Sequence, residues 1–353
     1  MKNFSVTDRS INLTVLAIGM DALSYTVHFG VASVVLSVIG TVSSVVCIWH
    51  TKRQLQQYRE KSAASQILLI SLSLATFLFC GFCLPVNSYT MIQGPLNYLG
   101  DKLPLCLAHT YIYYLLITVC AFSHSSMAIN RLLLVVINPC GFAAITTSLL
   151  ISCWIFPAII YLFPLLSIGG RFGYSPTRNR CGLVEIDTTY HLFCKVIYAF
   201  IPLMIVVVCY GWIIVNEVLV KRRVDRACSV VPRVRSAKRG RLQRDLKATK
   251  VACVMSIVFM VCYLPFAVYG IVVRRLEGLE SVVGMGFDLW VWIGCSINPI
   301  VYGVLTQLLR RQKRLLTGVT HLEMEMSKTR SLGAGVMCVF PGANRVDDMA
   351  HRD

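Results

Sequence analysis

Seven long runs of mostly apolar residues, separated by short polar or charged segments, dominate the chain. They cover residues 27–49, 65–90, 105–137, 142–166, 190–219, 246–273 and 282–305. Each run is long enough to cross a bilayer, because a spanning helix needs about 20 apolar residues. The pattern predicts an all-α membrane protein, a bundle of seven transmembrane helices.

The count of seven depends on the boundary between the third and fourth runs. No charged residue lies between Arg131 and Arg171. The tetrapeptide Asn138-Pro139-Cys140-Gly141 supplies the break, since Pro and Gly beside a polar residue favour a turn. The alternative is one long kinked span and only six crossings.

Charge supports the membrane interpretation and gives an orientation. Charged residues make up 14% of the chain, against about 25% in soluble domains. The net charge of +17 arises largely from basic segments after the first, fifth and seventh runs, which lie on one side only if the crossings number seven. Positive loops stay in the cytosol. The absence of a separate basic soluble module argues against nucleic-acid binding.

The two ends of the chain fit this orientation. Asn3 and Asn12 each begin an Asn-x-Ser/Thr triplet, a glycosylation acceptor on the outside of the cell. We therefore predict an extracellular glycosylated tail over residues 1–26 and the bundle over 27–305. Paired leucines beside a basic face predict a short amphipathic juxtamembrane helix over 306–316. Residues 317–353 are predicted to form a disordered cytoplasmic tail of a plasma-membrane protein.

Several short motifs occur in order and at matching depths in the runs. They are Asn130-Arg131-Leu132, Trp154, Pro202 with Tyr210, Phe259 with Cys262-Tyr263-Leu264-Pro265, and Asn298-Pro299-Ile300-Val301-Tyr302. Together they resemble the rhodopsin-like (class A) G-protein-coupled receptors over roughly residues 27–316. Asn130 and the Cys-Tyr-Leu-Pro motif resemble the melatonin receptors and the group that includes trapped-in-endoderm and moody.

The resemblance implies a cell-surface receptor that binds an extracellular ligand in the bundle. Outward movement of the sixth helix would then activate heterotrimeric G proteins. It also implies a disulfide between Cys106 and Cys181 on the oxidising side. The residues implied in the switch and in G-protein coupling are Asn130, Arg131, Tyr210, Asp245, Asn298, Pro299 and Tyr302.

Proline gives two of the spans a hinge. Pro202 and Pro265 each remove a backbone donor and kink a helix, and Phe259 and Tyr263 lie close to the second kink. Arg131 is expected to pair with Asp245 in the resting state; the alternative is that it reaches the lipid headgroups.

The chain departs from the family pattern at two places. Asn130 stands where the family has an acid, which removes one restraint on Arg131. Thr76 stands where the family has the Asp of a sodium site, and its partner positions hold Thr41 and Cys120. Without a carboxylate, we expect no sodium site there and no bound metal.

Ionisable and aromatic residues gather on the outer halves of the spans. Those expected to line a ligand pocket are His109, Tyr113, Tyr114, Lys195, Tyr198, Tyr263, Phe266, Tyr269 and Asp288. Aromatic walls with a few polar groups are typical of small-molecule sites. Tyr113 replaces the Asp of amine receptors, which argues against an amine. Lys195 either neutralises an acidic ligand, pairs with Asp288, or reaches outward.

The ligand class stays open among small molecules, lipid-like compounds and peptides. Membrane lipids are expected partners, and no cofactor is implied. Enzyme chemistry has no support, because no nucleophile–base or metal motif occurs. A transporter would be expected to show internal repeats, which this chain lacks. A receptor-like binding protein without G-protein coupling stays an alternative, given Asn130 and Leu132.

Overall fold

The protein is described here by a computed structural model. The described residues are 6–56, 60–93, 103–137, 141–175, 180–226, 232–272 and 282–308. Among them are seven helices long and apolar enough to cross a membrane, which confirms the predicted bundle. The chain divides into the units Met1–Val304 and Leu305–Asp353.

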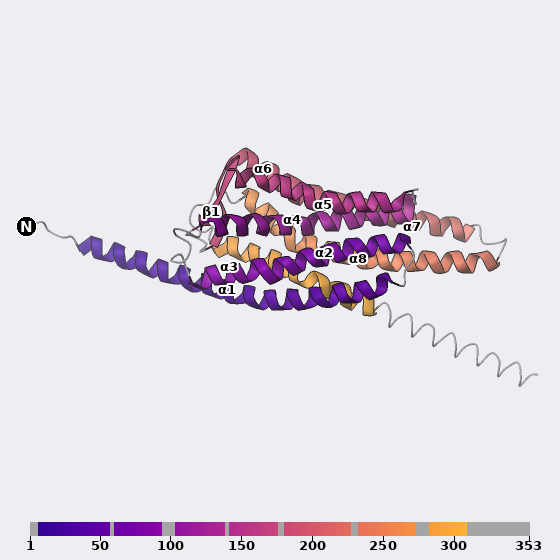
Figure 1. The fold of residues 1–353 in the computed structure, drawn as a ribbon, viewed down its shortest axis with the longest axis horizontal. Helices are drawn as coiled ribbons and strands as arrows, with labels where there is room; N and C mark the ends of the chain where they lie inside the picture. Colours follow the sequence, from indigo (N-terminus) through magenta and orange to yellow (C-terminus); the bar gives the residue numbers. More distant parts are fainter. Residues whose placement is uncertain are drawn as a thin grey trace, which may run out of the picture. The chain divides into compact units, whose positions relative to one another are not determined.

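The spanning parts of the helices follow the apolar runs, whereas α1 and α8 begin well before them. The elements are α1 (Val6–Leu55), α2 (Glu60–Leu78) continued by α3 (Leu84–Gln93), α4 (Leu103–Leu132), α5 (Phe142–Leu165), α6 (Thr188–Lys195) continued by α7 (Ile201–Arg226), and α8 (Pro232–Val272). The seventh spanning helix covers Val282–Leu308. Helix α4 packs against α2, α5, α7 and α8, so it lies at the centre of the bundle (Figure 1).

The third and fourth runs form separate helices. A π-helical segment, η3 (Leu133–Ile137), continues α4 to its end. Gly141 precedes α5 with φ of 73°, a left-handed conformation that glycine adopts without strain. This break confirms seven crossings, and residues 138–140 lie outside the described part of the chain.

Small residues allow α1 to approach the second span closely. A Cβ added at Gly40 would lie 2.3 Å from the Cys80 Sγ, so only glycine fits. The Ser37 hydroxyl donates to the Cys80 carbonyl at 2.7 Å. The opposite face of α1 exposes valines such as Val38 and Val42, each 59% exposed, as expected for a face in contact with lipid. Small residues and side-chain hydrogen bonds therefore hold α1 against the second span.

Two spans change their helical pitch beside a proline. The π-helical segment η1 (Phe79–Cys83) precedes Pro85, and η4 (Val196–Phe200) precedes Pro202. A proline ring clashes with the carbonyl one turn earlier, and a wider π turn relieves that clash. Pro265 lies inside α8 without such a segment.

An antiparallel hairpin joins α5 to α6, and the sequence analysis did not predict it. Strand β1 (Gly170–Ser175) pairs with β2 (Arg180–Ile186), with Tyr174 opposite Cys181. Both strands pack against α4. The hairpin therefore covers the end of the bundle where α4 begins.

The predictions for the two ends of the chain stay largely untested. Helix α1 begins at Val6, so helix extends through much of the segment assigned to the tail. Asn3 and the side chain of Asn12 lie outside the described part. The amphipathic helix is described only to Leu308, and the tail after it is not described.

Candidate functional site

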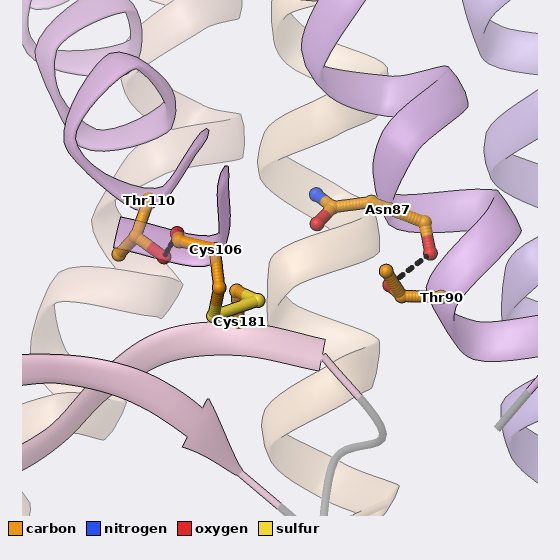
Figure 2. Close-up of a disulfide and its surroundings, with 5 residues drawn as sticks. All are labelled: Asn87, Thr90, Cys106, Thr110 and Cys181. Atoms are coloured by element: carbon orange, nitrogen blue, oxygen red, sulfur yellow. Dashed lines mark hydrogen bonds between the residues drawn. A yellow bond between two sulfur atoms is a disulfide. The ribbon is translucent and has the colours of Figure 1, made fainter. Parts of the chain in front are cut away.

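A disulfide fixes the hairpin to the start of α4. Cys106 and Cys181 are bonded with their Cα atoms 5.5 Å apart (Figure 2), as the family resemblance implied. Both are buried, and Tyr174 packs against the bond. The tether holds the beginning of β2 over the interior of the bundle.

Arg180, the residue before Cys181, extends into that interior. Its guanidinium forms a salt bridge with Asp288 of the seventh helix, and their side chains are only 5% and 3% exposed. Burial lowers the pKa of Arg180, but attraction to Asp288 and to neighbouring tyrosines outweighs this and raises the pKa above its ordinary value. The guanidinium is therefore a permanent buried cation.

The sequence analysis missed Arg180 and left the partner of Asp288 open. The structure pairs Asp288 with Arg180. Lys195 ends α6, and its side chain is not among those described. The available signal for Arg180 was its position next to a disulfide-bonded cysteine, since the tether carries that residue into the bundle.

Two aromatic rings flank the cation. The Arg180 Cζ lies 5.8 Å from the ring centroids of both Tyr113 and Trp292, within cation–π range. The Trp292 indole N–H donates to the Tyr113 hydroxyl at 2.8 Å. Tyr113, predicted to line the pocket, therefore joins α4 to the seventh helix beside the ion pair.

Tyr114 extends the aromatic wall toward the hairpin. Its ring stacks on those of Phe172 of β1 and Tyr161 of α5, with ring centroids 6.0 Å and 5.6 Å apart. The ring centroids of Tyr198 and Tyr161 lie 6.1 Å apart. Tyr114 and Tyr198, both predicted pocket residues, thus belong to one cluster that joins four elements.

His109 and Asn87 add two further buried polar groups. The His109 Nε2–H donates to the Cys83 carbonyl at 3.2 Å. The Asn87 amide extends from α3 toward the disulfide (Figure 2). The Arg180 Nη1, the His109 Nδ1 and the Asn87 Nδ2 are all buried without a hydrogen-bond partner. Such unsatisfied groups are rare in native proteins, so these three have capacity for a further partner such as a water or a ligand.

The remaining predicted pocket residues lie along α8. Tyr263 stacks on Phe259 at 5.4 Å and lies 6.2 Å from Phe266. Tyr269 packs on Phe287 of the seventh helix at 4.7 Å. Of these three predicted pocket residues, Tyr263 and Phe266 therefore belong to one row of rings. Tyr269 belongs to a separate contact between α8 and the seventh helix.

His124 joins three helices below this site. The Asn298 amide N–H donates to its Nε2 at 3.2 Å, so Nδ1 carries the proton and donates to the Ser256 hydroxyl at 3.3 Å. The imidazole stacks on Phe259 at 4.5 Å and is fully buried. The sequence analysis did not select His124, because a single His in an apolar run has no motif around it.

Asn130 also joins three helices. Its amide N–H donates to the Ser65 hydroxyl at 2.7 Å, and its carbonyl accepts from the Thr146 hydroxyl at 3.0 Å. The side chain is 1% exposed. A neutral amide can make both bonds at once, so Asn130 connects α4 to α2 and α5 instead of restraining Arg131 through charge.

The other predicted switch residues lie at the same end of the bundle. Tyr210 is buried and interacts electrostatically with Arg131. Tyr302 is 9% exposed, and Pro299 is buried. The side chain of Asp245 is not among those described. Its pairing with Arg131 therefore stays a prediction.

Thiol and hydroxyl groups line the position where the family has a sodium site. The Thr76 hydroxyl lies 4.0 Å from the Cys120 Sγ, and the Cys80 Sγ lies 3.5 Å from the Ser296 hydroxyl. None of these groups carries the negative charge that a hard cation prefers.

The fold and the site define a class: a seven-helix membrane protein with a buried polar site beneath a disulfide-tethered hairpin. The family model "7 transmembrane receptor (rhodopsin family)" matches residues 43–302. The chain belongs to this rhodopsin family of receptors.

Individual relatives agree with the family assignment. The chain is 23% identical to 5-hydroxytryptamine receptor 4 of Cavia porcellus, over 79% of this chain and 76% of the relative. It is 21% identical to protein trapped in endoderm-1 of Drosophila melanogaster, over 79% of this chain and 74% of the relative. The crystal structure of squid rhodopsin has the same fold, with a TM-score of 0.67, 16% identity and coverage of 82% and 84% of the two chains.

Proposed function

We propose that the protein is a plasma-membrane receptor that binds an extracellular ligand beneath the hairpin and activates heterotrimeric G proteins. One observation carries the proposal. Two rows of residues lead from the ligand site to the predicted switch residues. One lies on the seventh helix, which carries both Trp292 and Asn298. The other is a stack of rings that runs from Tyr263 through Phe259 to His124. A ligand that shifts the upper end of either row would change the contacts of His124.

Ligand binding is coupled to the sixth helix in this proposal. The inner part of α8 contacts α4 through the Ser256 and Phe259 contacts with His124. Pro265 lies between these contacts and the outer end of α8, where the helix can bend. Outward movement of the cytoplasmic part of α8 would break the His124 contacts and open a cleft for a G protein.

The proposed orientation has the hairpin outside and the C-terminus in the cytosol. The disulfide supports it, because disulfides persist in oxidising compartments. Epitope labelling of unpermeabilised cells tests it. Detection of both chain ends in the same compartment would contradict the orientation and, with it, the receptor proposal.

The membrane itself is a proposed partner along the outer faces of the helices. An apolar groove of about 460 Å³ lies between α8 and the seventh helix, lined by Val261, Pro265, Val283, Gly286, Phe287 and Trp290. Val261 is 58% exposed, so the groove opens toward the acyl chains and not toward the polar site.

A G-protein dissociation assay across the α-subunit classes tests the coupling. We expect basal dissociation from at least one class that scales with surface expression, and we expect Arg131→Ala to abolish it. A basal signal that Arg131→Ala leaves unchanged would favour the alternative, a receptor-like binding protein without G-protein coupling.

A further inference from the structure

Among the side chains that the structure describes, the site contains one buried carboxylate, and it is already paired with Arg180. Asp288 accepts from the Arg180 Nη2 atom. A cationic ligand would have to displace a guanidinium that the neighbouring disulfide holds in place. It would also meet the positive charge of Arg180 itself. The site therefore disfavours amines, although 5-hydroxytryptamine receptor 4 is among the relatives.

The cation, in contrast, has an unused donor. Arg180 is buried, and its Nη1 has no hydrogen-bond partner. A guanidinium has five N–H donors and no acceptor, so only an acceptor can satisfy Nη1. A buried charged donor left without an acceptor is costly, which favours a ligand that supplies one.

A second unused donor, the side-chain amide of Asn87, lies on α3. The Asn87 Nδ2 is buried without a partner, and its amide is on the side of α3 toward the disulfide in Figure 2. Strand β2, which carries Arg180, packs against α3, which carries Asn87. A carboxylate has two oxygens and can accept from two such donors, one on β2 and one on α3.

The rings around Arg180 indicate the chemistry of the rest of the ligand. Tyr113 and Trp292 flank the guanidinium, and the Tyr114 cluster continues the wall toward α5. An apolar or aromatic body would pack against these rings while its acidic group meets Arg180.

We propose that the ligand presents a carboxylate to the free Nη1 of Arg180, with an apolar or aromatic body against Tyr113 and Trp292. This proposal rests on the proposed ligand-binding function and names the ligand class. Arg180, which the structure describes, takes the ligand-neutralising role that was one of three alternatives for Lys195.

Thermal unfolding of the purified full chain in lipid nanodiscs tests the proposal with matched probe pairs. The pairs are indole-3-acetate with tryptamine, and decanoate with decylamine, each sharing a body and differing in the charged group. We expect the carboxylate of at least one pair to raise Tm saturably, because a ligand that binds only the folded state stabilises it. We expect neither amine to raise Tm.

Three variants assign the effect to a residue. In Arg180→Met/Asp288→Leu both charges are removed together, because a lone buried charge would destabilise the fold. This variant should lose the carboxylate effect. Asp288→Asn removes the competing carboxylate but leaves Arg180 as a buried charge without its partner, so its ligand-free Tm should be lower. Measured as a rise above that Tm, the concentration of carboxylate for half-maximal stabilisation should fall about tenfold. Arg171→Met, at an exposed position of β1 in the same hairpin, is the matched control and should behave as the unmodified chain.

The results separate this proposal from the broader one. The proposal would be overturned if the carboxylate effect survives in Arg180→Met/Asp288→Leu. It would also be overturned if only an amine raises Tm, or if neither carboxylate does. Unfolding requires no G protein, so any of these results leaves the coupling proposal standing. Equally, a chain without G-protein coupling can still bind the carboxylate.

Discussion

The contacts of His124 predict that its removal activates the protein without ligand. His124→Leu keeps an apolar side chain of comparable size in the interior but removes the imidazole. The variant loses the hydrogen bond to Ser256 and the stack on Phe259, both of which join His124 to α8. It also loses the hydrogen bond from Asn298 of the seventh helix. Movement of α8 away from α4 breaks the two contacts with α8, so their loss destabilises the closed arrangement relative to the open one.

The structure gives the size of the effect. A buried hydrogen bond between membrane helices contributes about 0.6–1.7 kcal/mol. An aromatic stack adds about 0.5–1.5 kcal/mol. The closed arrangement therefore loses about 1–3 kcal/mol, which corresponds to a rise of about 5- to 150-fold in the open-to-closed ratio. Ser256→Ala removes only the hydrogen bond and should give the smaller part of this rise.

Basal G-protein dissociation in cells, measured against surface expression, is the assay. Thr118→Val is the matched control, because the Thr118 hydroxyl lies 2.9 Å from that of Tyr161 on α5 and not on α8. It removes a buried hydrogen bond of α4 without affecting α8. The reasoning is refuted if His124→Leu leaves basal dissociation unchanged, or if Thr118→Val raises it equally.

A second readout does not depend on G-protein coupling. Spin labels at the cytoplasmic ends of α4 and α8 report their separation by electron–electron double resonance. We expect a larger population at long distance in His124→Leu than in the unmodified chain. An identical distance distribution in the two proteins would argue against His124 as a contact that holds α8.

Three further predictions concern the same end of the bundle. Asn130→Leu should lower the stability of the purified protein by about 1–3 kcal/mol, because it removes the partner of the Ser65 hydroxyl and the link to Thr146. Thr146→Val should cost less, since it removes only one of the two bonds of Asn130. Equal unfolding temperatures for Asn130→Leu and the unmodified chain would contradict this. Asp245→Asn should raise basal G-protein dissociation at equal surface expression if Asp245 restrains Arg131, and an unchanged basal signal counts against that pair. Replacing sodium by choline as the bulk cation should leave ligand affinity unchanged, since Thr76 supplies no carboxylate; a loss of affinity specific to sodium would show that a cation binds there.

The spans and their order follow from the sequence alone. A membrane helix must bury its backbone polar groups in its own hydrogen bonds, so about 20 apolar residues already specify the element. The break after the third span was predictable for a similar reason, because Gly141 takes a conformation that other residues avoid. The pairing of Cys106 with Cys181 followed from the family resemblance, which spacing alone could not have supplied.

The tertiary structure alone decided which polar side chains meet. Arg180 and Asp288 are 108 residues apart, and His124 and Asn298 are 174 residues apart. No periodicity in the sequence connects such pairs, because their contact depends on how the helices rotate and tilt against one another. The hairpin was missed for the same reason: its strands are short, and a tether to α4 holds them. Local hydrophobicity thus fixed the spans, whereas packing between distant segments fixed the chemistry of the site.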